Sequence, residues 1–217
     1  MESILKITNL NKSYGDNHVL RDMNLTIERG DFVVLTGPSG SGKSTFLNIV
    51  GLLDKQDSGD VVYFGTKNPV PFSSSASKIL RNKVGYLFQN FALIETKTVE
   101  QNLMIALEFS KGNNKKTQIS DALDYVGLSG FEKKKISQCS GGEQQRIAVA
   151  RLLLKPCELI LCDEPTGSLD YENRQNIIKL LLKLQEDGKT VLIVSHDPEV
   201  IEIAKTHHSL TGLMSSI

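Results

Sequence analysis

The sequence GPSGSGKST, residues 37–45, decides the fold of this chain. It follows the apolar, strand-like segment Phe32–Leu35 and leads into a helix-like segment, which is the setting that a phosphate-binding loop needs. Its glycines let the backbone curl so that successive N–H groups point at phosphate oxygens. Lys43 adds a charge for the β- and γ-phosphates, and the Ser44 hydroxyl is placed to bind magnesium at the positive end of the next helix. We therefore expect a nucleoside triphosphate to be bound by Gly37, Pro38, Ser39, Gly40, Ser41, Gly42, Lys43, Ser44 and Thr45.

Length and composition limit the classes of protein to which the chain can belong. Its 217 residues suffice for one α/β core, or for a core with a small inserted subdomain, and give no sign of two independent domains. Lysine plus arginine and aspartate plus glutamate number 25 each, so no basic field favours a nucleic acid partner. No stretch reaches the roughly 18 apolar residues of a membrane span, and the segment Met1–Thr8 has no signal-peptide pattern. We expect the chain itself to be soluble and intracellular.

The cysteines and the local basic runs indicate no separate site. Cys139, Cys157 and Cys162 are odd in number and lack CxxC spacing, so we expect three reduced thiols rather than disulfides or a zinc site. The runs Asn113–Lys116 and Lys133–Lys135 favour a solvated surface over a nucleic acid or lipid contact.

Strand and helix signals alternate along the chain. Short apolar runs, typical of strands covered on both faces, occur at 4–8, 32–36, 61–64, 84–88, 159–162 and 190–194. Helical periodicity is found at 44–53, 99–109, 118–126, 142–154, 172–186 and 198–204. The alternation predicts a parallel-rich α/β sheet whose ligands bind at the carboxyl ends of the strands, where the glycine loop lies.

No strand signal is evident between about residues 91 and 138, where helices and the polar stretch Lys111–Thr117 dominate. We interpret this region as a helical insertion into the α/β core. The Ser73–Ser75 cluster, which follows two prolines, predicts a loop.

A second motif is LILCDE, residues 159–164, a buried strand that ends in two carboxylates. Because side chains alternate along a strand, the two carboxylates point in different directions and can divide two tasks. Asp163 is placed to hold magnesium, and Glu164 to orient or deprotonate the attacking water. The alternative is an ordinary acidic strand end before a Pro-Thr-Gly turn. Two carboxylates beside a polyphosphate repel it without a metal, so the motifs together imply Mg²⁺.

A third motif is CSGGEQQR, residues 139–146, which precedes an alanine- and leucine-rich helix. It combines the Ser140 hydroxyl, the bare backbones of Gly141 and Gly142 and a helix N-terminus, which together predict a second anion site. Only one glycine–lysine loop is present in the sequence. We therefore expect a homodimer on triphosphate binding, in which this segment of each chain covers the γ-phosphate held by its partner.

The motifs together resemble those of the ATP-binding subunit of an ABC transporter, and the resemblance covers nearly the whole chain. CSGGEQQR stands in the place of the family signature, usually LSGGQ. The sequences of Phe88–Phe91 and of DEPTGSLD, residues 163–170, are most similar to those of the MacB, LolD and FtsE-like branch, which includes exporters of peptides and bacteriocins. The resemblance implies one α/β domain over residues 1–217. That domain has a P-loop NTPase-type, RecA-like core with a parallel-rich sheet, an antiparallel β part and an inserted α-helical subdomain at about 91–140. ATP follows as the nucleotide.

The resemblance also implies roles for residues that carry little signal alone. Tyr14 matches the aromatic residue that stacks on adenine, and Gln89 the glutamine that contacts magnesium and the catalytic water. His196 matches the histidine that contacts the γ-phosphate, and Ser168–Asp170 the loop that crosses the dimer. The catalytic set is then Glu164, His196, Lys43 and Gln89, and the magnesium ligands are Ser44, Gln89 and Asp163.

Two positions depart from the family signature. Cys139 replaces the usual leucine, a change of packing that cysteine tolerates as a small hydrophobe. Glu143 replaces the usual glutamine, so a carboxylate lies in the first turn of a helix near the triphosphate. It favours the helix dipole and opposes the bound anion, so we expect weaker affinity at the signature.

The family likeness implies an ATP hydrolase that powers export or extraction of a substrate. Transport then requires a separate integral membrane subunit, which would place the chain at the cytoplasmic face of the membrane. We expect Phe91–Gln101 to dock there, with Phe91, Leu93 and Ile94 either exposed anchors or part of the core of the insertion. One alternative is a cell-division-type ATPase that drives a membrane partner without transport. Another is a soluble ATPase of translation or chromosomes, for which the sequence shows no tandem domain or basic extension.

Overall fold

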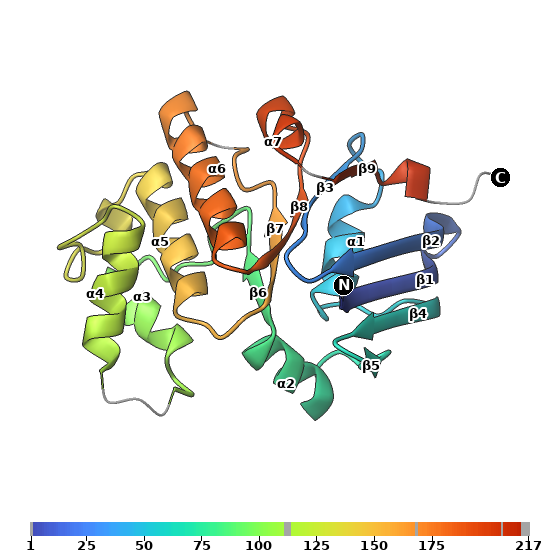
Figure 1. Ribbon diagram of the computed structural model, residues 1–217, viewed down its shortest axis with the longest axis horizontal. Helices are drawn as coiled ribbons and strands as arrows, with labels where there is room; N and C mark the ends of the chain where they lie inside the picture. The colour runs from blue at the N-terminus through green and yellow to red at the C-terminus, as the bar shows by residue number, and fades with distance from the viewer. Residues whose placement is uncertain (1, 111–113, 168, 205, 214–217) are drawn as a thin grey trace.

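The fold is built on two β-sheets of different type (Figure 1). The computed structural model describes residues 2–110, 114–167, 169–204 and 206–213. One sheet is antiparallel, in the order β2-β1-β4-β5, and consists of β1 (Ser3–Tyr14), β2 (Asn17–Glu28), β4 (Ser58–Tyr63) and β5 (Thr66–Lys67). The other is parallel, in the order β6-β7-β8-β3-β9, and consists of β3 (Phe32–Thr36), β6 (Val84–Leu87), β7 (Leu159–Asp163), β8 (Thr190–Val194) and β9 (Thr206–Ser209).

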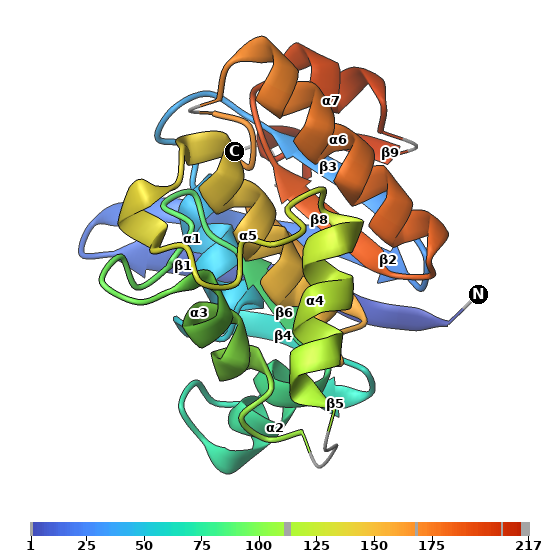
Figure 2. The same cartoon turned by 90° about the vertical axis from the view of Figure 1, so that its left-hand side faces the viewer.

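The helices lie in the connections between the strands. They are α1 (Lys43–Val50), α2 (Ser74–Asn82), α3 (Val99–Ala106), α4 (Lys115–Tyr125), α5 (Gly141–Leu153), α6 (Tyr171–Glu186) and α7 (Pro198–Glu202), with 3-10 turns η1 (Ile136–Gln138) and η2 (Thr211–Leu213). The helices α3, α4 and α5 pack on one another and lie farthest from the antiparallel sheet (Figures 1 and 2).

The parallel sheet separates two hydrophobic cores, because successive side chains of its central strands point to opposite faces. On one face, Val34, Ile160 and Val191 pack with residues of α5 and α6. On the other face, Leu35 and Leu161 pack with residues of α1 and of the antiparallel sheet. All these side chains are buried, which explains why β3, β7 and β8 read as continuous apolar runs.

The predicted core strands and all six predicted helices are present, but the strands β2, β5 and β9 and the helix α2 were not expected. The strand β2 alternates exposed and buried residues, and β5 and β9 are short and exposed, so none of them forms an apolar run. The loop expected at Ser73–Ser75 is wrong: Ser73 caps α2, and its side chain accepts a hydrogen bond from the Ala76 N–H.

The region predicted as a helical insertion carries α3, α4 and η1. Between residues 91 and 140, strand pairing in the described part is limited to one isolated bridge between Thr98 and Lys135. Of the helices in the described ranges, none has both the length and the apolar character needed to cross a membrane.

Candidate nucleotide site

The phosphate-binding loop joins β3 to α1, as the sequence predicts. Lys43 begins α1, and its Nζ donates to the carbonyl oxygens of Gly37, at 2.8 Å, and Pro38, at 3.0 Å. The ammonium group therefore lies within the curve of the loop. Gly42 has a φ of 93°, and a Cβ at this position would lie 2.8 Å from Val19 Cγ1 of β2. Glycine is required at position 42 because the loop is pressed against the antiparallel sheet.

The acidic strand end lies next to this loop. Asp163 is the last residue of β7 and is half-buried. Burial raises the pKa of the Asp163 carboxyl, the neighbouring charge of Glu164 raises that pKa further, and the charge of Lys43 opposes both effects. Two carboxylates and one ammonium group are thus within electrostatic reach of one another, as expected from the sequence.

Glu164 is turned toward the end of the neighbouring strand. Its backbone has a left-handed φ of 45°, and its N–H donates to the Val194 carbonyl oxygen at 2.9 Å. The carboxylate accepts a hydrogen bond from Ser195 Oγ at 3.1 Å through Oε2. Its Oε1 lies 2.8 Å from His196 Nδ1, and because a carboxylate accepts, Nδ1 is the donor. Glu164 and His196, two of the four residues predicted for catalysis, therefore contact each other directly.

Gln89 and Tyr14, two further predicted site residues, follow β6 and end β1, respectively. Gln89 is exposed and follows the end of β6 by two residues, where Leu87 pairs with Cys162 of β7. It is thus close to the strand end that carries Asp163. Tyr14 ends β1, has a ring that is 51% exposed, and donates its hydroxyl hydrogen to Asp54 Oδ2 at 2.5 Å.

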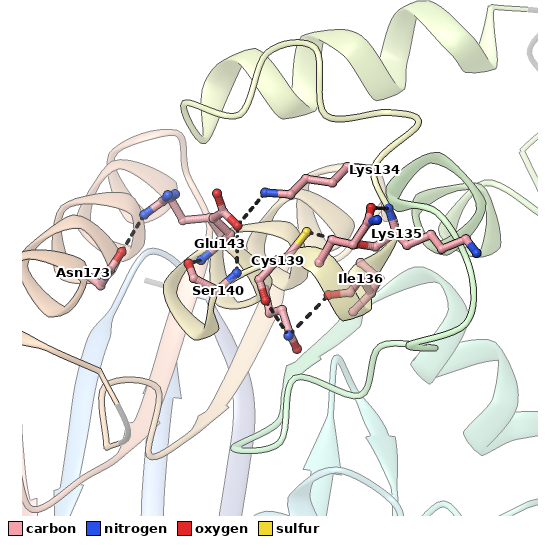
Figure 3. A network of polar contacts seen from close by, with 10 residues as sticks. Lys134, Lys135, Ile136, Cys139, Ser140, Glu143 and Asn173 are labelled. Carbon is pink, nitrogen blue, oxygen red and sulfur yellow. Dashed lines mark hydrogen bonds and ion pairs between the residues drawn. The ribbon is translucent and has the colours of Figure 1, made fainter.

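The signature segment forms the N-terminus of α5 (Figure 3). Ser140 Oγ accepts from the Glu143 N–H at 3.2 Å, and Glu143 Oε2 accepts from the Ser140 N–H at 2.8 Å, a reciprocal capping box. Glu143 Oε2 is also 2.9 Å from Lys134 Nζ. Burial alone would raise the pKa of Glu143, but the hydrogen bonds from Lys134 and Ser140 and the charges of Lys134 and Arg146 hold it below its usual value.

The ion pair with Lys134 changes what the sequence led us to expect at this position. Glu143 was expected to present an unpaired negative charge to the triphosphate. Part of that charge is neutralised within the chain, because Lys134 lies nine residues earlier in the loop before η1. The repulsion of a bound anion is correspondingly smaller.

The signature helix is tied to the segment that follows Glu164. The buried Gln145 Nε2 donates to the Pro165 carbonyl oxygen at 2.8 Å. Asn173 of α6 accepts from Arg146 at 2.8 Å and donates to the Asp170 carboxylate at 2.8 Å. Of the expected dimer-crossing loop, Asp170 caps α6 and Leu169 packs on the core, whereas Ser168 lies outside the described residues.

The helices that carry on from the two glycine-rich segments lie on opposite faces of the parallel sheet. Residues of α1, which follows the phosphate loop, belong to one hydrophobic core, and residues of α5, which follows Ser140, belong to the other. The parallel sheet therefore lies between these two helices. This placement agrees with the expectation of two half-sites.

An apolar groove of about 810 Å³ lies between β6, α3 and the end of α5. Its lining includes Leu53, Ile105 and Phe109, which are 40%, 46% and 62% exposed. Of the expected docking residues, Phe91 and Leu93 pack partly on the core, as the alternative reading held, and Ile94 is 41% exposed. The exposed apolar surface therefore lies mainly beside the predicted docking stretch Phe91–Gln101, and only part of that stretch contributes to it.

Sequence reasoning missed several contacts of the site. Gln145 belongs to the signature motif and Ser195 directly precedes His196, but nothing in their positions shows that Gln145 bonds Pro165 and Ser195 bonds Glu164. Asp54 follows Tyr14 by 40 residues, so no local pattern joins them.

Residues 20–167 match the family described as ABC transporter. An ABC transporter ATP-binding protein of Methanocaldococcus jannaschii, MJ0796, is 41% identical over 91% of this chain and 88% of its own length. A lipoprotein-releasing system ATP-binding protein, LolD 1 of Rhodopseudomonas palustris, is 36% identical over 93% of both chains. The macrolide export ATP-binding/permease protein MacB of Mannheimia succiniciproducens is 37% identical over 91% of this chain, which spans 32% of the length of that relative.

A solved structure of the MJ0796 cassette has the same fold, with a TM-score of 0.80 at 39% identity, covering 90% of this chain and 89% of that one. It is described as a dimer in a post-hydrolysis state, bound to ADP and Pi. The α/β fold predicted from the sequence is confirmed by this likeness.

Proposed function

The chain belongs to the ABC transporter family, and on that basis we propose that it binds and hydrolyses ATP as a homodimer, to power a separate integral membrane subunit that exports or extracts a substrate. The observation that carries this proposal is that the helix after the phosphate loop, α1, and the helix that the signature begins, α5, pack on opposite faces of one sheet. Each chain would thus offer two half-sites, each completed by its partner. Two ATP molecules would then hold two chains together, and loss of the γ-phosphate would release them.

The arrangement of the side chains supports the roles assigned to them. Lys43 would bind the β- and γ-phosphates from within the loop, together with the backbone N–H groups of the loop. Glu164 would orient the attacking water, and His196, which contacts it, would lie at the γ-phosphate. Ser140 of the partner would complete the site through the α5 N-terminus.

Magnesium fits the residues at this centre. Ser44, Gln89 and Asp163 offer a hydroxyl, an amide oxygen and a carboxylate, which are oxygen ligands that Mg²⁺ prefers. In the described part of the chain, no group of three or more His, Cys, Asp or Glu side chains could hold a metal by itself. That finding agrees with a cation that takes most of its ligands from phosphates and water. When bound, Mg²⁺ would neutralise charge on the triphosphate.

The membrane subunit is proposed to dock on the apolar groove. Exposed apolar surface of this extent beside Gln89 suits an apolar or amphipathic segment of a partner protein. Docking there would couple the partner to the glutamine that begins the helical subdomain, for which we propose residues 91–140 within a single cassette domain. The chain would thus reach the inner face of the membrane through its partner.

The test is ATP-dependent dimerisation of a variant that cannot hydrolyse ATP. Glu164→Gln should lower turnover by about 10² to 10⁴, because a general base typically contributes that much. It should also sediment as a dimer with ATP and Mg²⁺ and as a monomer without them. Glu202→Gln, an exposed glutamate on α7, is the matched control and should behave as wild type. A Glu164→Gln chain that stays monomeric with ATP, alone and with its membrane subunit, contradicts the proposal.

A further inference from the structure

A buried lysine lies beneath the exposed tyrosine that ends β1. Lys12 is only 8% exposed, although lysine is almost never fully buried without a partner. Its Nζ donates to Asp54 Oδ1 at 3.0 Å and to the Lys55 carbonyl oxygen at 2.7 Å. The same Nζ lies over the Tyr14 ring, 4.9 Å from the ring centroid. One face of the tyrosine is therefore occupied by a cation.

The hydroxyl end of the same ring is also fixed. Tyr14 donates to Asp54 Oδ2 at 2.5 Å, so the two oxygens of one carboxylate hold the tyrosine and the lysine. The hydrogen bond to Asp54, followed by burial, raises the pKa of the Tyr14 hydroxyl, and the neighbouring Thr45 side chain lowers it.

Asp54 connects this ring to the helix of the phosphate loop. It follows the end of α1 by four residues, and its N–H donates to the Asn48 carbonyl oxygen of α1 at 3.1 Å. The ring on β1 and the helix that holds the phosphates are thus joined through one carboxylate. A base bound on Tyr14 and phosphates bound in the loop would keep a fixed separation.

We propose that Lys12 and Asp54 are positioning residues that hold the Tyr14 ring as one wall of the base site, with Lys12 on one face and the purine of the nucleotide on the other. This inference rests on the proposed function. The two residues act through Tyr14 and not on the phosphates. Their contribution should therefore depend on the presence of a base in the ligand.

The experiment compares binding of ATP and of inorganic tripolyphosphate to the full chain by calorimetry. Asp54→Asn and Lys12→Met should each weaken ATP binding by about three- to tenfold, a part of what a stacked base contributes. Tripolyphosphate affinity should stay unchanged, and in hydrolysis the KM for ATP should rise while kcat stays within a factor of about two. Lys12→Arg, which keeps the cation, should restore part of the loss. A thermal melt of each variant checks that it is folded.

Asp57→Asn is the matched control. Asp57 also faces Lys12, at 3.8 Å, and accepts from the Ser13 N–H at 2.7 Å, but it makes no hydrogen bond to Tyr14 among the described contacts. It should leave ATP affinity unchanged. In a Tyr14→Ala chain, Asp54→Asn should have no further effect on ATP binding.

The outcomes separate the inference from the proposed function. Equal weakening of ATP and tripolyphosphate by Asp54→Asn, or a full effect in the Tyr14→Ala chain, overturns the positioning role. The positioning role is also overturned if Tyr14→Ala weakens ATP binding while neither Asp54→Asn nor Lys12→Met weakens it. A wild-type chain that binds no ATP contradicts the proposed function itself.

Discussion

The side chains of Glu164 and His196 are in direct contact, with 2.8 Å between Glu164 Oε1 and His196 Nδ1. Glu164 is held there by its left-handed backbone and by the bond from its N–H to Val194. The residue proposed to orient water and the residue proposed to contact the γ-phosphate therefore form one hydrogen-bonded unit.

Because they act as a unit, their substitutions should not be additive. His196→Ala should lower kcat by about 10² or more, and the double variant with Glu164→Gln should be no slower than the slower single variant. Single-turnover hydrolysis measures the rate of each single variant and of the double variant. If the two losses multiply, the contact has no role in catalysis.

Lys43→Ala should abolish nucleotide binding at concentrations that saturate the wild type. The ammonium group lies within the loop, on the Gly37 and Pro38 carbonyl oxygens, and would be the main charge facing the phosphates. Calorimetry with ADP gives the affinity. Lys97→Ala removes an exposed lysine and should bind as the wild type does.

Glu143→Gln tests the ion pair at the signature. The contacts of Glu143 lower its folded-state pKa, so its ionised form stabilises the fold above the usual carboxyl range, and this is lost as pH falls through the lowered pKa. Wild type should exceed the variant in free energy of unfolding by about 0.5 kcal/mol at neutral pH. The difference should shrink as the pH falls below the usual carboxyl range and through the lowered pKa of Glu143. Urea unfolding at neutral pH and at a series of acidic pH values measures it.

The same variant should dimerise at a lower ATP concentration, because Lys134 is then unpaired beside the phosphate. The double variant Lys134→Gln with Glu143→Gln restores the net charge and should return the ATP requirement to that of the wild type. If Glu143→Gln raises the requirement, the carboxylate has another role at the signature.

Gly142→Ala should be less stable than Gly141→Ala. A Cβ at 142 would lie 2.1 Å from Asn173 Oδ1 and displace an amide that bonds Arg146 and Asp170, whereas a Cβ at 141 meets nothing within 4 Å. Loss of those bonds should cost about 1 to 2 kcal/mol relative to the Gly141 variant. Chemical denaturation gives the comparison, and equal stability would show that Asn173 relaxes freely.

Ile105→Glu should reduce copurification with the membrane subunit by about tenfold or more, because it places a charge on an exposed apolar residue that lines the groove. Basal ATP hydrolysis should be unchanged. Val70→Glu, an exposed apolar residue outside the groove, is the control. Normal copurification of the Ile105 variant would exclude the groove as the docking surface.

The sequence predicted what depends on local pattern. The strands β3 and β8 were placed at their observed bounds because both of their faces are buried, and β2 was missed because only one face is. The strand end that bears Asp163 and the phosphate loop were located by their motifs. The contacts that bind Glu143 to Lys134 and Tyr14 to Asp54 arise from tertiary packing, and no spacing in the chain encodes them.

The buried bond from Gln145 to the Pro165 carbonyl oxygen has a consequence for a pair of chains. It connects α5, whose N-terminus would cover the partner's ATP, to Pro165, which directly follows the chain's own Glu164. In a dimer, occupancy of one nucleotide site would then affect the geometry of the other, and we expect hydrolysis to rise sigmoidally with ATP concentration.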